Sequence, residues 1–239
     1  MWPLLGQRVV SGTISDRFRE AGPVTLLGGG PVSQGDLDWA LARAPALYAA
    51  DGGAEHALAA NLVPRAVIGD LDSLTGTARA RLPGRIIEVA EQETTDFEKC
   101  LQRIDAPLVV ALGFIGARTD HTLAALAVTL RHGRPVLLLG PNDCGFACPR
   151  EFGIDLPAGM RVSLFPFAPV TGRSEGLRWP IDGLVLSPLG RLGTSNEATG
   201  PVKIALDGGG VAMLLPTSAR DAALAALSPT GCRAPRLPF

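Results

Sequence analysis

Short apolar runs alternate with stretches of helical periodicity through residues 24–139. A short apolar run is typical of a buried strand, and apolar residues three and four positions apart are typical of a helix that covers it. Strands that alternate with helices pair in parallel in a sheet that is covered on both faces. The expected strands are 24–27, 47–50, 66–68, 85–89, 108–112 and 135–139, and the expected helices are 34–42, 54–60, 75–81, one that begins near 95 and one that begins near 120.

The pattern changes after residue 143, where glycine and proline divide the chain into short runs. Short strands with frequent turns are typical of an antiparallel sandwich or barrel, and Asp207-Gly208 is a hairpin signal. We therefore expect an α/β protein, with a parallel-sheet domain at 1–143 and an antiparallel sandwich or barrel at 150–218. A helix and tail should follow at 219–239, with the final dozen residues disordered, and 1–22 should form a short strand or loose arm. The expected strands are 161–165, 177–179, 184–186, 202–206 and 211–215.

Composition narrows the class of protein. The chain has 239 residues, of which 46% are hydrophobic and 19% charged, as in a globular protein with a sizeable core. A formal net charge of −1 argues against a nucleic-acid binder, and no apolar run approaches the roughly 20 residues that a membrane span needs. The N-terminus lacks the features of a signal peptide, so we expect a cytoplasmic protein. The four cysteines lack zinc-site spacing and are expected to be structural or incidental.

The first candidate for chemistry is Gly69-Asp70-Leu71-Asp72-Ser73, which follows a predicted strand. Two carboxylates two positions apart on an extended chain point to the same side, with Leu71 turned back to the core. Ligands bind at the carboxyl ends of strands in α/β sheets, and Mg²⁺ prefers one or two carboxylates plus phosphate oxygens. The alternative is that both aspartates are turn residues and that Ser73 caps a helix.

Two further stretches carry charged side chains at the start of a predicted helix. Thr95 and Glu98 form a capping box, and Asp96 shares a face with Lys99. The alternative for Asp96 and Lys99 is a favourable helix-dipole contact and a solvated ion pair.

The second stretch is a glycine loop at 113–117 that leads into a helix, an arrangement that offers N–H groups to phosphate. Arg118 adds a bidentate donor. Asp120 could instead be only the N-cap and His121 a surface residue, and Gly28-Gly29-Gly30 could be only a tight turn.

Five short motifs in order, between Leu47 and Leu215, resemble those of the thiamine pyrophosphokinase family. Each is weak alone, but their order is specific. One departure is Ala117, where family members often have a second glycine before the arginine. The motifs are Ala50-Asp51-Gly52-Gly53-Ala54, Ile68-Gly69-Asp70-Leu71-Asp72-Ser73, Thr95-Asp96-Phe97-Glu98-Lys99, Gly116-Ala117-Arg118-Thr119-Asp120-His121 and Thr194-Ser195-Asn196-Glu197.

The resemblance implies a Rossmann-like nucleotide-binding domain at 1–143 and a β-sandwich at 150–218, in a homodimer with thiamine sites between subunits. It also implies ATP-dependent transfer of a pyrophosphoryl group to thiamine, leaving AMP. A pterin pyrophosphokinase and a non-catalytic nucleotide or thiamine sensor are the alternatives. An oxidoreductase is disfavoured because the glycine fingerprint is missing.

These considerations assign a role to each candidate residue. We expect Asp70, Asp72 and Asp96 to hold Mg²⁺, with Lys99 beside them in the catalytic group, and Arg118 and Lys99 to bind phosphate oxygens. The rest of the ATP site is expected to comprise Gly29, Asp51, Gly52, Asp120 and His121. The expected thiamine site comprises Gln92, Trp179, Ser195 and Asn196. The alternatives for Trp179 and Ser195 are a core tryptophan and a turn residue.

Overall fold

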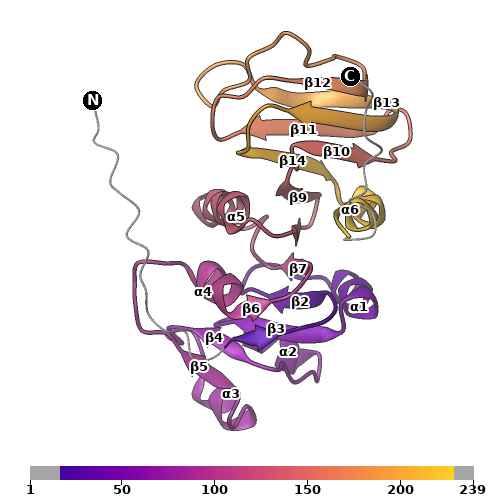
Figure 1. Cartoon of the computed structure of the whole chain (residues 1–239). Helices are drawn as coiled ribbons and strands as arrows, with labels where there is room; N and C mark the ends of the chain where they lie inside the picture. Colours follow the sequence, from indigo (N-terminus) through magenta and orange to yellow (C-terminus); the bar gives the residue numbers. More distant parts are fainter. Residues whose placement is uncertain (1–16, 229–239) are drawn as a thin grey trace, which may run out of the picture.

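The structure, a computed structural model, describes residues 17–228 (Figure 1). Most of its strands belong to one continuous sheet, whose order is β10-β13-β11-β14-β9-β8-β7-β2-β3-β4-β5, with β12 attached to β13. The protein is therefore a mixed α/β protein built around a large sheet. The expectations for an N-terminal arm before residue 17, for Cys232 and for a disordered tail lie outside the described residues.

The first half of this sheet is parallel. Its strands are β8 (Val136–Leu139), β7 (Val109–Leu112), β2 (Val24–Leu27), β3 (Ala46–Ala50), β4 (Val67–Gly69) and β5 (Ile86–Glu88). Each pairs in parallel with its neighbour, as the alternation of strands and helices predicted. β2, β3, β4, β7 and β8 are buried throughout, which explains why they read as unbroken apolar runs. A separate short pair, β1 (Phe18–Arg19) and β6 (Ile104–Asp105), lies outside this sheet.

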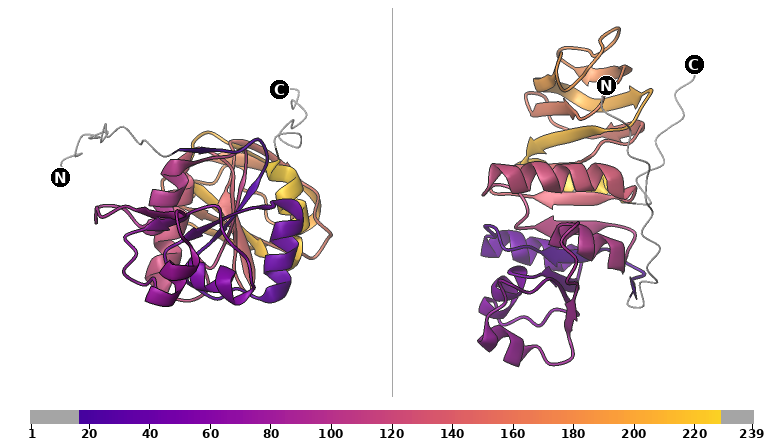
Figure 2. Two further views of the ribbon diagram at one scale, coloured as in Figure 1. Left: turned by 90° about the horizontal axis from the view of Figure 1, so that it is seen from below. Right: turned by 90° about the vertical axis from the view of Figure 1, so that its left-hand side faces the viewer.

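Helices cover both faces of the parallel strands (Figure 2). One buried cluster joins residues of α1 (Gln34–Arg43), α2 (Gly53–Ala59), α3 (Gly76–Arg81) and α6 (Arg220–Leu227) to one face of the sheet. A second cluster joins α4 (Asp96–Arg103) and α5 (Thr119–His132) to the opposite face. In α4 this apolar stripe is Phe97, Cys100 and Leu101, as its spacing predicted.

The second half of the sheet is antiparallel and consists of β9 (Asp143–Ala147), β10 (Glu151–Ile154), β11 (Arg161–Pro166), β12 (Gly172–Leu177), β13 (Gly193–Leu206) and β14 (Val211–Pro216). β9 pairs with both β8 and β14, so hydrogen bonds pass without a break from the parallel to the antiparallel strands. The long strand β13 pairs near its start with β11 and farther along with β10 and β12. A 3-10 turn, Thr217–Ala219, leads from β14 into α6.

Several expectations for this half were wrong. Residues 184–186 do not form a strand, since Leu186 makes only isolated bridges to Val170 and Arg191. The strand expected at 177–179 lies earlier, because β12 ends at Leu177. β9 and β10 were not anticipated. The glycines and prolines at 140–153 conceal them, and β9 is buried at its three central positions, so no polar alternation marks it.

Three thiols, those of Cys100, Cys144 and Cys148, are free and buried. Burial raises the pKa of the Cys144 and Cys148 thiols to about 12 and also raises that of Cys100. In a Cys232→Ser variant we therefore expect no thiol to react with a colorimetric disulfide reagent at neutral pH, and three to react after unfolding in denaturant. Rapid reaction of any thiol in the folded variant would contradict this burial.

Within residues 17–228, no helix combines the length and apolar character that a membrane crossing requires.

Candidate active site

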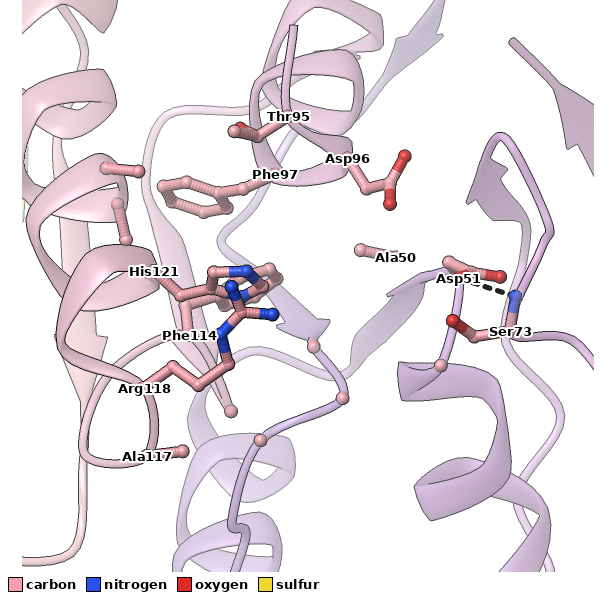
Figure 3. A pocket seen from close by; sticks show the side chains of 17 residues that line it. Ala50, Asp51, Ser73, Thr95, Asp96, Phe97, Phe114, Ala117, Arg118 and His121 are labelled. Atoms are coloured by element: carbon pink, nitrogen blue, oxygen red, sulfur yellow. Dashed lines mark hydrogen bonds between the residues drawn. The ribbon is translucent and has the colours of Figure 1, made fainter. Parts of the chain in front are cut away.

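The candidate site lies at the point in the parallel sheet where the order of successive strands reverses. From β2 the chain adds β3, β4 and β5 on one side and then returns to add β7 and β8 on the other. In sheets of this kind ligands bind beyond the carboxyl ends of the strands at such a switch point. A pocket of about 370 Å³ lies there, lined by the turns that follow β2, β3 and β7 and by parts of α4 and α5 (Figure 3).

Glycine shapes the floor of this pocket. The turns after β2 and β7 approach so closely that a Cβ on Gly28 would lie 2.7 Å from the backbone oxygen of Gly113. Gly113 itself has a φ of +78°, which favours glycine. Gly29 and Gly52 also line the pocket and face each other, with a Cβ on either placed 3.6 Å from the other's Cα. The glycines therefore keep the backbone near the space that a ligand would fill.

Three carboxylates gather at one side of the pocket. Asp51 follows β3, Asp70 follows β4, and Asp96 begins α4; one ligand oxygen from each lies within 4.8 Å of the others. Asp51 is 5% exposed, and its Oδ1 has no hydrogen-bond partner among the described residues. Its Oδ2 accepts the backbone N–H of Ser73 at 3.2 Å, as Figure 3 shows. Burial raises the pKa of Asp51 above its usual value, so a cation at this cluster would relieve an unfavourable charge.

Asp72 lies outside this cluster. The chain is not extended after β4, because Leu71 has a φ of +65°, and the expected alternation of side chains does not hold there. Leu71 is buried, as expected, but Asp72 is exposed, and its carboxylate accepts the hydroxyl of Ser73 at 3.0 Å. Asp51 takes the third place in the carboxylate group. The role of Asp72 in holding Mg²⁺ stays a prediction.

Lys99 is fully buried beside the same carboxylates. Its side chain is 1% exposed, and its Nζ lies 3.0 Å from Asp96 Oδ1 and 3.5 Å from Asp70 Oδ2. Burial lowers the pKa of Lys99, but the hydrogen bond and charge of Asp96 outweigh this and raise the pKa overall. The solvated ion pair considered for Lys99 is excluded by this burial. Its ammonium faces the carboxylates in this structure. The expected contact of Lys99 with phosphate stays a prediction.

Gln92, expected at the thiamine site, lies at this cluster. Its Nε2 donates to Asp70 Oδ2 at 3.0 Å, which is the main reason that the pKa of Asp70 lies below its usual value. α4 starts as predicted, since Thr95 Oγ1 accepts the N–H of Glu98. The other half of the capping box is different: the Glu98 carboxylate accepts from Arg131 of α5 at 2.9 Å.

The other side of the pocket is aromatic and basic. Phe97 of α4 and Phe114 of the loop after β7 lie with ring centroids 4.4 Å apart, and His121 and Arg118 project from the start of α5 (Figure 3). Arg118 is the N-cap of α5 and forms a two-point ion pair with Asp120, at 3.1 Å and 2.6 Å. Asp120 is therefore within α5 and is not its N-cap. Phe114 was not among the expected site residues, although its place in the glycine loop was a usable signal.

The remaining candidates lie in the antiparallel half. Trp179 is 55% exposed, which rules out the alternative of a core tryptophan. The buried side chain of Asn196 holds it in place: Oδ1 accepts the N–H of Trp179 at 3.1 Å, and Nδ2 donates to its carbonyl at 2.7 Å. Ser195 is exposed with a φ of +60°, and its N–H donates to Ser163 Oγ.

Trp179 and Asn196 line a separate hollow of about 220 Å³, together with Leu186 and Leu192. None of its lining residues also lines the first pocket. A single chain, as far as residues 17–228 describe it, therefore does not bring these candidates to the carboxylates.

Comparisons with known proteins match two separate parts of the chain to two family models. Residues 37–137 match the family model for the thiamin pyrophosphokinase catalytic domain, and residues 148–211 match that for the thiamin pyrophosphokinase vitamin B1 binding domain. The chain is 27% identical over 154 residues to thiamine pyrophosphokinase 1 of Oryza sativa subsp. japonica, covering 56% of this chain and 58% of that protein. It is 25% identical over 154 residues to thiamin pyrophosphokinase 1 of Caenorhabditis elegans, covering 57% and 63%. These matches thus span less than two thirds of either relative.

Among solved structures, thiamin pyrophosphokinase from Candida albicans superposes with a TM-score of 0.71 at 16% identity. The match covers 84% of this chain and 93% of that one. At this identity the likeness shows a shared fold.

Proposed function

Because the chain belongs to the thiamin pyrophosphokinase family, we propose that it transfers a pyrophosphoryl group from ATP to the hydroxyethyl group of thiamine. The products are thiamine diphosphate and AMP. The observation that carries this proposal is the group of carboxylates at the switch-point pocket, one of which has a buried oxygen without a partner among the described residues. Such oxygens suit a hard divalent cation that also binds phosphate.

Each group of residues would have its own role in this reaction. Asp51, Asp70 and Asp96, with Asp72 as a further candidate, would hold Mg²⁺, which when bound neutralises charge on the transferring phosphoryl groups. The glycine turns and the start of α5 would hold ATP, with Gly29, Gly52 and His121 at the pocket wall. Asp120 would orient the guanidinium of Arg118 toward phosphate. Phosphoryl transfer depends mostly on positioning and charge neutralisation, and these residues would contribute to both.

The thiamine site would be shared by two subunits of a homodimer. Trp179 offers an exposed aromatic side chain to a cationic ring. Asn196, which follows Ser195 in β13, is hydrogen-bonded to the Trp179 backbone. Their separation from the carboxylates within one chain supports a site completed across a dimer, with Gln92 contributing from the carboxylate side. We also propose that residues 1–143 form a Rossmann-like domain and that residues 150–218 form a β-sandwich domain. The enzyme would be cytoplasmic and would bind neither nucleic acid nor a membrane.

The test is product analysis. Purified protein with ATP, Mg²⁺ and thiamine should release AMP and thiamine diphosphate in equal amounts, as separated by chromatography. Release of ADP would indicate a simple phosphotransferase. Activity with a pterin alcohol only, or binding of ligands without turnover, would replace this proposal by one of the alternatives.

Arg118→Lys is expected to weaken ATP binding. Lysine keeps the charge but loses the planar fork that pairs with Asp120 and that suits phosphate oxygens. We expect KM for ATP to rise about tenfold with a smaller change for thiamine, corresponding to roughly one lost charge-assisted hydrogen bond. Steady-state kinetics with each substrate varied in turn measures this. Arg131→Lys, an exposed arginine on the same helix, is the matched control. Unchanged KM for ATP in Arg118→Lys would show that Arg118 is only a surface charge.

Ser195→Ala is expected to raise KM for thiamine much more than KM for ATP. Mixed dimers of a Ser195→Ala subunit and an Asp96→Asn subunit should regain activity, because one of the two shared sites would then contain neither substitution. The recovered activity can be measured after separating differently tagged dimers. The assay uses a thiamine concentration below the KM of Ser195→Ala, so that both parents are poorly active. Mixed dimers no more active than their parents would then show that each site is built within one chain.

A further inference from the structure

A side-chain amide extends the pairing of β12 with β13 beyond the end of β12. The two strands are antiparallel neighbours, and the residue after β12, Arg178, still donates its N–H to the carbonyl of Glu197 at 2.8 Å. At Trp179 the side chain of Asn196 replaces the backbone partner: Oδ1 accepts the N–H at 3.1 Å, and Nδ2 donates to the carbonyl at 2.7 Å. One amide thus bonds to both polar groups of the Trp179 backbone, as a residue of a neighbouring strand would.

A bulge in β13 separates the surroundings of Asn196 from those of Ser195. The register between β11 and β13 shifts opposite this stretch. Ser195 has a φ of +60°, and its N–H donates to the hydroxyl of Ser163 at 3.1 Å. A bulge redirects the side chains beside it, and here Ser195 is exposed whereas Asn196 is buried.

The amide of Asn196 is committed almost fully to the protein. Besides the N–H of Trp179, its Oδ1 accepts the N–H of Glu197 at 2.9 Å, so both lone pairs of this oxygen are used. Asn196 borders the hollow beside Trp179 but is only 7% exposed, whereas Trp179 is 55% exposed. The indole therefore offers the larger surface to a ligand, and the amide fixes the backbone that carries it.

Two neighbours of Trp179 make the indole sensitive to its backbone. The guanidinium of Arg178 lies 5.0 Å from the centroid of the indole and forms an ion pair with Glu197 at 3.5 Å. Pro180 follows and restricts the backbone of the residue before it. A shift of the Trp179 backbone would therefore move the indole against these neighbours and away from the place where it can stack on a ring.

We propose that Asn196 is a positioning residue, whose whole contribution to thiamine binding passes through Trp179. Its amide holds the Trp179 backbone, and the indole contacts the ligand. Ser195, the exposed neighbour in the bulge, stays the candidate for a direct polar contact. The inference rests on the proposed function, since thiamine is the ligand that it assigns to Trp179.

The experiment is a double-mutant cycle on the dissociation constant of thiamine, measured by titration calorimetry on the full chain. Asn196→Asp keeps the acceptor but sets a carboxylate oxygen against the Trp179 carbonyl. The lost hydrogen bond should raise Kd for thiamine about tenfold. Trp179→Ala should also raise Kd, and Asn196→Asp should add nothing in that background, because residues that act as one unit are not additive.

Steady-state kinetics supplies a second readout and a matched control. Asn196→Asp should leave KM for ATP unchanged, and kcat at saturating thiamine should be unchanged as well. A loss of overall stability would lower the active fraction and with it kcat. Asn61→Asp makes the same chemical change at an exposed position after α2 and should alter none of these constants.

Three results of the cycle would overturn the proposal. Effects of Asn196→Asp and Trp179→Ala that multiply in the double variant would show that Asn196 contacts thiamine directly. An unchanged Kd in either single variant would show that the residue has no part in binding. Asn196→Ser takes the place of Asn196→Asp if the aspartate variant does not fold.

Fluorine NMR of the chain labelled with 5-fluorotryptophan tests the positioning without any ligand. Trp179→Phe assigns the signal of Trp179, and Trp39 in α1 is the internal reference. Asn196→Asp should shift or broaden the Trp179 signal and leave the Trp39 signal unchanged. An unchanged Trp179 signal in the folded variant would overturn the proposal.

Product analysis separates this inference from the proposed function. AMP formation by the wild-type chain, together with effects that multiply in the cycle, would refute the role of Asn196 and leave the activity standing. Thiamine binding with the expected cycle but without AMP formation would refute the activity and leave the role of Asn196 standing. A wild-type chain that does not bind thiamine would overturn both.

Discussion

Asp96→Asn is expected to lower kcat by about 10²- to 10⁴-fold, because losing one cation-binding charge removes several kcal/mol of transition-state stabilisation. Asp96 begins α4 and contributes one of the converging oxygens of the cluster. Asparagine keeps an oxygen for Lys99 and for the N–H of Asp70, so the fold should be retained. AMP production under saturating substrates measures the loss, and thermal unfolding checks the fold.

Two companion variants sharpen this test. Asp155→Asn makes the same chemical change at an exposed position in the antiparallel half and should leave kcat unaltered. Asp72→Asn asks whether Asp72, which lies outside the cluster, joins it when nucleotide is bound. A loss as large as that of Asp96→Asn would show that it does. Near-normal turnover of Asp96→Asn would remove the carboxylate cluster from the proposed reaction.

Gly53→Ala is expected to destabilise the protein by about 3 kcal/mol, the upper part of the range for overpacking. The added Cβ would lie 2.1 Å from the backbone oxygen of Leu27 and 2.5 Å from its carbonyl carbon. Both are backbone atoms of β2, so the start of α2 must move away from the sheet. Asp51 lies two residues earlier, so the cluster should be displaced and activity lost as well.

Gly35→Ala is the matched control for this change. Gly35 lies in the first turn of α1, and a Cβ there meets nothing within 4 Å. Alanine is the better helix former, so stability should rise by up to about 1 kcal/mol. Urea unfolding of both variants gives the two free energies of unfolding. Equal stabilities for Gly53→Ala and the wild-type chain would show that α2 does not contact β2 as described.

Some of the candidate site could be predicted from local pattern. Asp70 and Asp96 were predicted as site residues because Asp70 follows a predicted strand and Asp96 begins a predicted helix. An acidic side chain at either place suggests a ligand site without any knowledge of the tertiary structure. Asp51 was placed in the ATP wall, but its membership of the carboxylate cluster was not foreseen. That membership depends on the pairing of β3 with β4, which aligns Ala50 with Ile68. Neither motif contains this pairing.

By itself, the sequence determined the elements of the parallel half and the order of the motifs. Buried strands such as β2 and β7 must be apolar at nearly every position, and a helix such as α4 must carry its stripe at helical spacing. These are local requirements, so they are visible along the chain. They also place Asp51, Asp70 and Asp96 at the ends of elements.

Only the tertiary structure decided which of these residues meet. The left-handed conformation of Leu71 turns Asp72 away, and the packing of α4 against β4 buries Lys99 between two carboxylates. It also decided that β9 continues the sheet and that 184–186 does not form a strand. Contacts between segments far apart in the chain decide all three features: the positive φ angle of one residue, the burial of one charged side chain and the pairing of distant strands. No local pattern of apolar and polar residues encodes them.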